Sequence, residues 1–144
     1  MRAFVNTLDL ESGTDELSDP RALEAWLERH ALAHGGSASS ADLHAARSLR
    51  EALRTLLLEN NGVRVREEAA LALNQAAERG RLALRFDPPS GVRLEAGATG
   101  PEGALGRLAA IAAGAMTDGT WRRLKACRAE RCGWAFYDHA RNRS

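Results

Sequence analysis

In residues 81–96, RLALRFDPPSGVRLEA, the hydrophobic pattern of the chain changes from helical spacing to strict alternation. Apolar residues alternate with polar or small residues on both sides of a Pro-Pro-Ser-Gly segment. Alternation is typical of β-strands, and a turn segment between two such runs predicts a β-hairpin. We expect antiparallel strands near residues 81–87 and 91–96. A two-stranded hairpin is only marginally stable alone, so it should pack on helices.

Helical patterns precede and follow this hairpin. An Asp19-Pro20 pair, in which an N-cap residue is followed by proline at the first helical position, predicts the start of a first helix. Ser39 or Ser40 is the expected N-cap of a second helix, whose apolar residues recur at helical spacing. The expected helices span residues 20–34, 40–59, 65–79 and 102–117.

The expected fold is therefore mainly α. A helical domain over residues 1–118 contains the one β-hairpin, and a separate C-terminal segment over residues 119–144 follows. A Thr-Asp-Gly-Thr sequence at residues 117–120 is typical of such a boundary. In the helical domain we expect one core that buries Leu53, Leu56, Leu105 and Leu108.

The composition limits the class of protein. The 144-residue chain is 44% hydrophobic and 27% charged, which is ordinary for a soluble globular domain. No apolar run is long enough to span a membrane, and the N-terminus lacks the hydrophobic region of a signal peptide. Two cysteines exclude a disulfide-rich secreted scaffold, so we expect a cytoplasmic protein. The 28 alanines and 19 arginines fit a GC-rich, bacterial genome.

Charge is unevenly distributed along the chain. Residues 121–144 contain 7 basic and 2 acidic residues, a net charge of +5, whereas the rest of the chain has a net charge of −4. Cationic side chains neutralise phosphates and release counterions, so this segment is a candidate DNA-binding surface. The candidate residues are Arg122, Arg123, Lys125, Arg128, Arg131, Arg141 and Arg143. The alternative is a solvated basic surface over a small aromatic core; Trp134 and Phe136 alternate as in a short strand and are expected in that core.

The same segment contains both cysteines. Cys127 and Cys132 are separated by four residues, and a glycine follows the second cysteine. Two thiolates at this spacing can form half of a zinc knuckle, because thiolates bind Zn²⁺ well and glycine permits a tight turn. A structural zinc site needs four ligands, and His139 is the only nearby histidine. The alternative is a pair of free thiols.

Four stretches carry a resemblance to a known family. Residues 123–127, RLKAC, and 132–144, CGWAFYDHARNRS, resemble the first half of the CGNR-type zinc finger. The segment FVNT at residues 4–7 is similar to the opening motif of the ABATE domain, and LREALR at residues 49–54 is similar to its central motif. The resemblance covers nearly the whole chain, and it implies a helical domain joined to a zinc finger in a stress-induced transcription regulator.

The resemblance also has a consequence for the metal. In this family the finger continues with a second cysteine pair that ends in Cys-Gly-Asn-Arg, and the chain ends at Ser144, where that pair is expected. The segment is therefore interpreted as a truncated zinc finger. We expect zinc in the full-length parent protein, and an absent or incomplete zinc site, with loosely held residues 141–144, in this chain.

A second candidate site lies near the N-terminus. Asn6 and Thr7 are polar residues in an apolar segment, so their hydrogen bonds must be satisfied. One interpretation is structural: they cap a turn or anchor the chain to a helix near Arg50. The other is functional: Asn6, Thr7 and Arg50 line a pocket that binds a small molecule.

Enzymatic activity is not expected. The sequence contains no P-loop, no Rossmann glycine motif and no nucleophile elbow. His30 and His34 lie four residues apart at a predicted helix end, but no neighbouring carboxylate completes a metal motif, which favours a solvated helix end.

The predicted function is transcription regulation. The helical domain is expected to sense an unknown small-molecule effector or to form a homodimer, while the basic zinc-finger module contacts DNA. The alternative is a ligand-binding or protein-interaction domain that does not bind DNA and whose zinc module is only structural.

Overall fold

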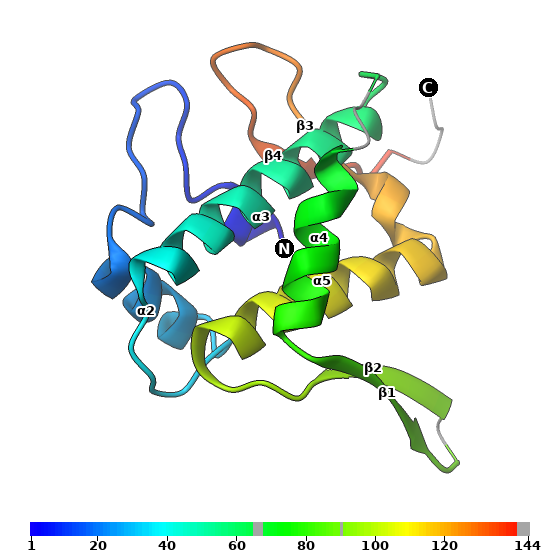
Figure 1. Ribbon diagram of the computed structural model, residues 1–144. Helices are drawn as coiled ribbons and strands as arrows, with labels where there is room; N and C mark the ends of the chain where they lie inside the picture. The colour runs from blue at the N-terminus through cyan, green and yellow to red at the C-terminus, as the bar shows by residue number, and fades with distance from the viewer. Residues whose placement is uncertain (65–67, 90, 141–144) are drawn as a thin grey trace.

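A computed structural model of the protein describes residues 1–64, 68–89 and 91–140 (Figure 1). The elements in these ranges are α1 (Arg2–Val5), α2 (Pro20–Arg29), α3 (Ser40–Glu59), α4 (Glu68–Arg79), β1 (Leu82–Asp87), β2 (Gly91–Ala96), α5 (Gly100–Asp118), the 3₁₀ helix η1 (Thr120–Arg123), β3 (Leu124–Ala126) and β4 (Ala135–Tyr137). The fold is mainly α-helical, as predicted, but the described ranges contain two small antiparallel hairpins rather than one. None of the helices described is long and apolar enough to cross a membrane.

The N-terminal ends of α2 and α3 follow the sequence signals. The Asp19 side chain accepts a hydrogen bond from the backbone N–H of Ala22, and proline occupies the first turn of α2. Ser39 and Asp42 form a reciprocal capping box at the start of α3. These caps satisfy N–H groups that have no partner within the helix, which fixes where each helix begins.

The end of α2 corrects the prediction of a helix to residue 34. The helix ends at Arg29, and Ala31 adopts a left-handed conformation with φ of 53°. The backbone N–H of Leu32 then donates to the carbonyl of Leu27, as in a Schellman-type helix end. The reversal turns Leu32 and Ala33 back onto the hydrophobic core, which helical spacing alone did not reveal.

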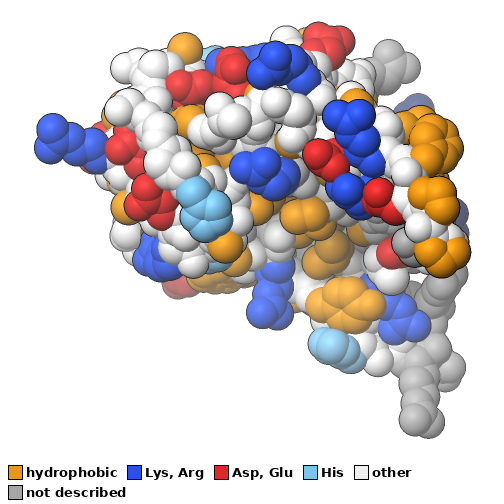
Figure 2. All heavy atoms as spheres, turned by 90° about the horizontal axis from the view of Figure 1, so that it is seen from below, with side chains coloured by type: hydrophobic (Ala, Val, Ile, Leu, Met, Phe, Trp, Pro, Cys, Tyr) orange, Lys and Arg blue, Asp and Glu red, His pale blue; other side chains and the backbone are white. Residues whose placement is uncertain are grey.

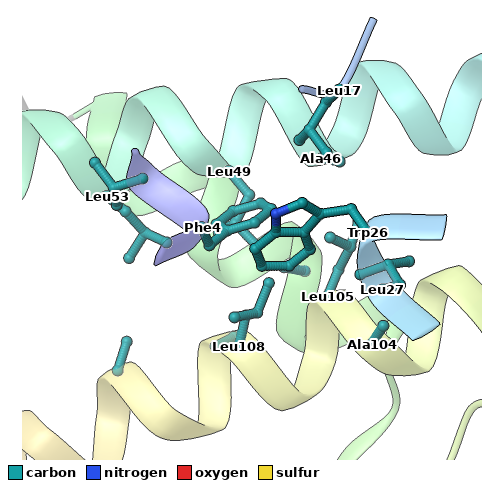
Figure 3. Close-up of a cluster of buried hydrophobic side chains, with 14 of the residues drawn as sticks. Phe4, Leu17, Trp26, Leu27, Ala46, Leu49, Leu53, Ala104, Leu105 and Leu108 are labelled. Carbon is teal, nitrogen blue, oxygen red and sulfur yellow. The ribbon is translucent and has the colours of Figure 1, made fainter. Parts of the chain in front are cut away.

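The hydrophobic core lies between α3 and α5 (Figure 3). Phe4 from α1 and Trp26 from α2 fill the space between these helices, with their ring centroids 5.4 Å apart. The short helix α1 has too few residues for a periodicity to be detected, and the sequence did not predict it.

Leucine side chains of α3 and α5 form the centre of this core. Leu53, Leu105 and Leu108 are buried together, as predicted. Leu56 is only partly buried, and its neighbour Leu57 occupies a fully buried position instead.

The hairpin of β1 and β2, called the long hairpin below, projects from the helical body (Figure 1). The two strands pair antiparallel, with Leu84 opposite Leu94 and Phe86 opposite Val92, in the predicted segment. Only its base packs on the helices. Just before it, an added Cβ at Gly80 would lie 2.5 Å from the Cα of Gly106, so the backbone contacts α5 directly there. The expectation that the hairpin packs on helices therefore holds for its base alone.

The second hairpin consists of β3, β4 and the loop between them, residues 124–137, and is called the C-terminal hairpin below. Its strands pair antiparallel, with Ala126 opposite Ala135. The prediction that Trp134 and Phe136 are core residues is wrong, because they are 44% and 40% exposed. Buried and exposed side chains do alternate along this segment, as predicted. The side that faces the helical body carries the small Ala135, and the side with Trp134 and Phe136 faces outward.

Candidate functional site

The C-terminal hairpin packs against the helical body, with β3 beside α3 and β4 beside α1. Asn6, the residue after α1, pairs with the backbone of Ala135. Its amide nitrogen Nδ2 donates to the carbonyl of Ala135 at 3.0 Å, and its Oδ1 accepts from the N–H of Ala135 at 2.7 Å. The side chain thus takes the place of a further strand beside β4, because it satisfies both backbone groups of Ala135, the buried residue of that strand.

Two further asparagines at the end of α3 bind the other strand and the turn before it. The Nδ2 of Asn60 donates to the carbonyls of Trp121 and Leu124 at 2.8 and 2.9 Å. The Nδ2 of Asn61 donates to the carbonyl of Ala126 at 2.9 Å. Three side-chain amides from the helical body therefore fix the position of the C-terminal hairpin.

Thr7, the residue after Asn6, belongs to a polar network that also contains Arg50 and Asp15. Thr7 donates its hydroxyl to the carbonyl of Phe4 at 2.8 Å and accepts from Nη1 of Arg50 at 3.2 Å. The guanidinium of Arg50, only 3% exposed, also binds both carboxylate oxygens of Asp15, at 2.6 and 3.1 Å. Burial raises the pKa of Asp15, but the hydrogen bonds from Arg50 and from the N–H of Leu17 outweigh it and bring the pKa below its usual value.

Asn6, Thr7 and Arg50 are therefore brought into one region, where their polar groups bind other parts of the chain. These contacts favour the structural interpretation of the three residues. Their proposed role in binding a small molecule stays a prediction.

Arg54 lies beneath the loop that joins β3 and β4, residues 127–134, called the cysteine loop below. Its Nη2 donates to the carbonyls of Val5 and Leu8 at 2.8 and 3.2 Å, while its Nε and Nη1 have no hydrogen-bond partner in the described residues. Burial lowers the pKa of this guanidinium from its usual value. An added Cβ at Gly133 would lie 2.9 Å from Nη1 of Arg54 and 2.7 Å from the side chain of Leu10. Gly133 also has a φ of 59°, so both its backbone and its surroundings favour glycine.

Both cysteines lie in the loop that joins β3 and β4: Cys127 is its first residue, and Cys132 lies three residues before β4. Both are free thiols, and the backbone N–H of Cys127 donates to the carbonyl of Trp134 at 2.9 Å. The N–H of Ala129 and a hydrogen bond with the thiol of Cys132 lower the pKa of Cys127 from its usual value. Two adjacent thiols, one of them with a lowered pKa, followed by a left-handed glycine, fit two of the four ligand positions of a zinc ion.

The described residues do not supply the other two ligands. They contain no group of three or more His, Cys, Asp or Glu side chains that could hold a metal ion. His139 is the nearest candidate in the sequence. Its ring packs against that of Tyr137, with the ring centroids 4.9 Å apart. Cys127 and Cys132 are thus the residues that would hold zinc, and they form half of a site.

The basic residues of this segment divide into three groups. Arg122, Arg123, Arg128 and Arg131 are exposed, and in the described part of the chain their guanidinium groups make no ion pair. Lys125 is largely buried and donates to Asp138 at 2.7 Å, a hydrogen bond that lowers the pKa of that carboxyl. The last two candidates, Arg141 and Arg143, lie outside the described residues, as does the expectation of loosely held residues 141–144.

Comparison with known families agrees with this arrangement. A family model described as "Putative stress-induced transcription regulator", ABATE, matches residues 2–119. The chain belongs to the ABATE family. A second family model, the CGNR zinc finger, matches residues 123–144. No curated protein matches the chain.

Several residues that join the ABATE domain to the zinc-finger segment were not predicted as site residues. Arg54 ends the central motif, but a guanidinium buried beneath a loop 79 positions later leaves no local signal in the sequence. Asn60 and Asn61 have the sequence pattern of a helix stop, and Asn61-Gly62 does follow α3. The polar residues of that stop also bind the C-terminal hairpin, and only the tertiary structure reveals this second role.

Proposed function

We propose that this ABATE protein is a transcription regulator that contacts DNA through the arginines of its C-terminal segment. The observation that carries the proposal is a set of four exposed guanidinium groups on η1 and the cysteine loop that make no ion pair with any described residue: Arg122, Arg123, Arg128 and Arg131. Elsewhere in the described chain many arginines are engaged by carboxylates or carbonyls, as Arg47, Arg50, Arg79 and Arg93 are. Unpaired cations need not break existing contacts before they bind phosphate.

The position of the C-terminal hairpin supports this function. Because Asn6, Asn60 and Asn61 hold the hairpin and the preceding η1 against the helical body, the arginines of both are presented from a fixed support rather than from a free tail. A fixed arrangement lowers the entropic cost of binding. The half-exposed rings of Trp134 and Phe136 provide apolar surface on the same hairpin for contacts with sugars or bases. Zinc, when bound with the help of ligands beyond the described residues, would hold the loop between Cys127 and Cys132 closed.

In this proposal the helical domain has the regulatory role. It senses an effector or forms a homodimer, in the cytoplasm of a bacterium and in response to stress. The family description supports the regulatory role, and the arginines support the contact with DNA.

The test is the salt dependence of DNA binding. Fluorescence anisotropy would measure the affinity of the chain for a labelled duplex over a series of salt concentrations, with and without added zinc. The logarithm of the association constant should fall linearly with the logarithm of salt concentration, by about 0.9 per phosphate contacted. An Arg122→Ala/Arg123→Ala variant should bind more weakly and reduce this slope by about 1 for each lost contact.

Arg21→Ala is the matched control, because Arg21 is also exposed but lies on α2. It should bind DNA as the unaltered chain does. The same slope for all three proteins, or no binding at low salt, would contradict the proposal.

A second candidate function is a ligand-binding or protein-interaction domain whose zinc module is only structural. The observation that favours it is the extensive hydrogen bonding between the C-terminal hairpin and the helical body, which a structural role alone would explain. The absence of salt-dependent DNA binding in the experiment above would favour this alternative.

A further inference from the structure

The long hairpin has one charged face and one apolar face. On the charged face, Arg93 pairs with Asp87 and Glu95 within the hairpin. On the apolar face, Phe86 is 76% exposed, and its partners across and along the strands are exposed as well: Leu84, Val92 and Leu94. Figure 2 shows hydrophobic side chains gathered at the right of the view, on the side of the molecule where the hairpin projects. An apolar two-stranded ribbon in water needs a cover for stability.

One stripe of α5 continues this apolar surface. A groove of about 750 Å³ runs between the long hairpin and α5. The helix contributes residues at spacings of three and four to it: Arg107, Ala110, Ile111, Gly114, Thr117 and Asp118. Ile111 is 48% exposed, and a Cβ at Gly114 would meet no atom within 4 Å. The stripe thus has an exposed branched side chain beside an open, small position.

The charges of this stripe are complementary to those of the same stripe on a second, antiparallel copy of α5. Arg107 lies near one end and Asp118 near the other, 11 residues apart, which is about 16 Å along a helix. In an antiparallel pair of α5 helices centred between Ala112 and Ala113, Arg107 faces the partner's Asp118. The same two-fold symmetry brings Ile111 opposite the partner's Gly114, where a close approach is possible.

We propose that a second copy of this chain covers the long hairpin and α5, with the two α5 helices antiparallel across a two-fold axis. Each apolar hairpin face then flanks the partner's α5. A two-fold interface uses the same patch on both copies, so the patch must be complementary to itself, and this stripe meets that requirement in both shape and charge.

The size of the patch agrees with such a dimer. The large apolar side chains of the hairpin and α5 together expose on the order of 500 Å², taking roughly 150–250 Å² for a fully exposed large side chain. An interface of standard size buries about 800 Å² per partner, of which roughly 60% is non-polar. The apolar part of such an interface therefore matches the patch in area.

The inference rests on the proposed function, in which forming a homodimer is one of the two roles given to the helical domain, and it can be tested without DNA. Sedimentation velocity of the chain from ~1 to ~100 µM should show a reversible monomer–dimer equilibrium. Ile111→Glu should raise the dissociation constant about 100-fold or more, because it buries a charge at the centre of the interface. Leu71→Glu is the matched control: Leu71 is 59% exposed, but it lies on α4 outside the groove, so the dimer should persist.

A charge exchange tests the orientation of the helices. Arg107→Asp and Asp118→Arg should each weaken the dimer about tenfold or more, since each places like charges opposite one another twice. The double variant should recover most of the lost affinity. Circular dichroism would verify that each monomer is folded, because Arg107 also donates to the carbonyl of Leu32.

A monomer at all concentrations, or a dimer that Ile111→Glu leaves intact, would overturn the inference; a dimer without charge rescue would overturn the antiparallel arrangement. These outcomes are distinguishable from failure of the proposed function. DNA binding that depends on Arg122 and Arg123 in a monomeric chain would leave the proposed function standing, and a dimer without DNA binding would leave this inference standing.

Discussion

The two β-hairpins of this chain have opposite relations to the helical body. The long hairpin has six-residue strands and an apolar face, yet most of that face is exposed. The C-terminal hairpin has three-residue strands, yet Ala126 and Ala135 are buried against α1 and α3. The hairpin with the stronger β-pattern in the sequence is therefore the less buried one.

The difference shows what fixes a short strand in this fold. The C-terminal hairpin has few apolar side chains to bury, but Asn6, Asn60 and Asn61 supply hydrogen bonds to its backbone. The long hairpin forms its hydrogen bonds internally and leaves an apolar face without a cover. Hydrophobic patterning thus predicts that a hairpin forms, while residues distant in sequence determine whether it is packed.

The largest effect is expected at the glycine of the C-terminal hairpin. Gly133→Ala adds a Cβ that would lie within 3 Å of Leu10 and Arg54, at a left-handed residue. The strained left-handed backbone, together with the shift that the ends of the Leu10 and Arg54 side chains must make, should destabilise the protein by about 2–3 kcal/mol. Gly91→Ala in the long hairpin is the control, because Gly91 also has a positive φ but meets no atom within 4 Å, so it should cost only about 1–2 kcal/mol. Urea unfolding of both variants would measure the difference, and equal losses would contradict the packing of the C-terminal hairpin.

A smaller loss is expected when the amide that replaces a strand is removed. Asn6→Ala leaves the buried N–H and carbonyl of Ala135 without partners, which should cost about 1–3 kcal/mol. Arg93→Ala removes only exposed ion pairs of the long hairpin and should cost at most about 1 kcal/mol. Urea denaturation gives both values; a variant Asn6→Ala as stable as Arg93→Ala would show that the amide does not hold β4.

Lowering the pH should destabilise the polar network of Asp15, Arg50 and Thr7 beside the C-terminal hairpin, because Asp15 becomes protonated. Because the pKa of Asp15 lies below its usual 3.8 in the folded chain, the folded state binds fewer protons than the unfolded state near that pH. The stabilisation from its pairing with Arg50 is therefore complete above the usual pKa and is lost as the pH falls through the folded value. The unfolding free energy should fall as the pH drops below about 5, and it should fall less in Asp15→Asn. Parallel pH profiles of the two proteins would contradict this role of Asp15.

The smallest effect is expected at the most exposed aromatic residue. Phe86→Ser changes a side chain that is 76% exposed, so the stability of the monomer should change by at most about 0.5 kcal/mol. The measurement is thermal unfolding at a protein concentration below the dimer dissociation constant. At higher concentration the same variant should melt earlier than the unaltered chain, because it removes part of the proposed interface. A large loss in the monomer would show that the long hairpin is packed after all.

Much of the fold follows from local signals in the sequence. The N-cap signal at Ser39 or Ser40, the proline after Asp19 and the alternation in residues 82–96 predicted the start of α3, the start of α2 and the long hairpin. These features succeed because each depends on residues close together in the chain. Helix α1 was missed because four residues are too few for a periodicity, and the end of α2 was misplaced because packing of Leu32 reverses the chain.

The candidate site was predictable in its components and not in its assembly. The cysteine pair and the excess of arginines are visible in residues 121–144. The contacts of Asn6 with Ala135, 129 positions apart, and of Arg54 with the turn at Gly133 depend on how α1 and α3 pack. The inward face of β4 was wrongly predicted for the same reason: the amide of Asn6 selects Ala135, although Trp134 and Phe136 are far more hydrophobic.

Hydrogen exchange of the Ala135 amide tests the central claim that the helical body holds the C-terminal hairpin. This N–H has the Oδ1 of Asn6 as its acceptor, at 2.7 Å. The account predicts that Ala135 exchanges nearly as slowly as amides at the centre of α3, and that Asn6→Ala removes this protection while the amides of α3 keep theirs. An Ala135 amide that exchanges in the unaltered chain as fast as exposed loop amides would contradict the account.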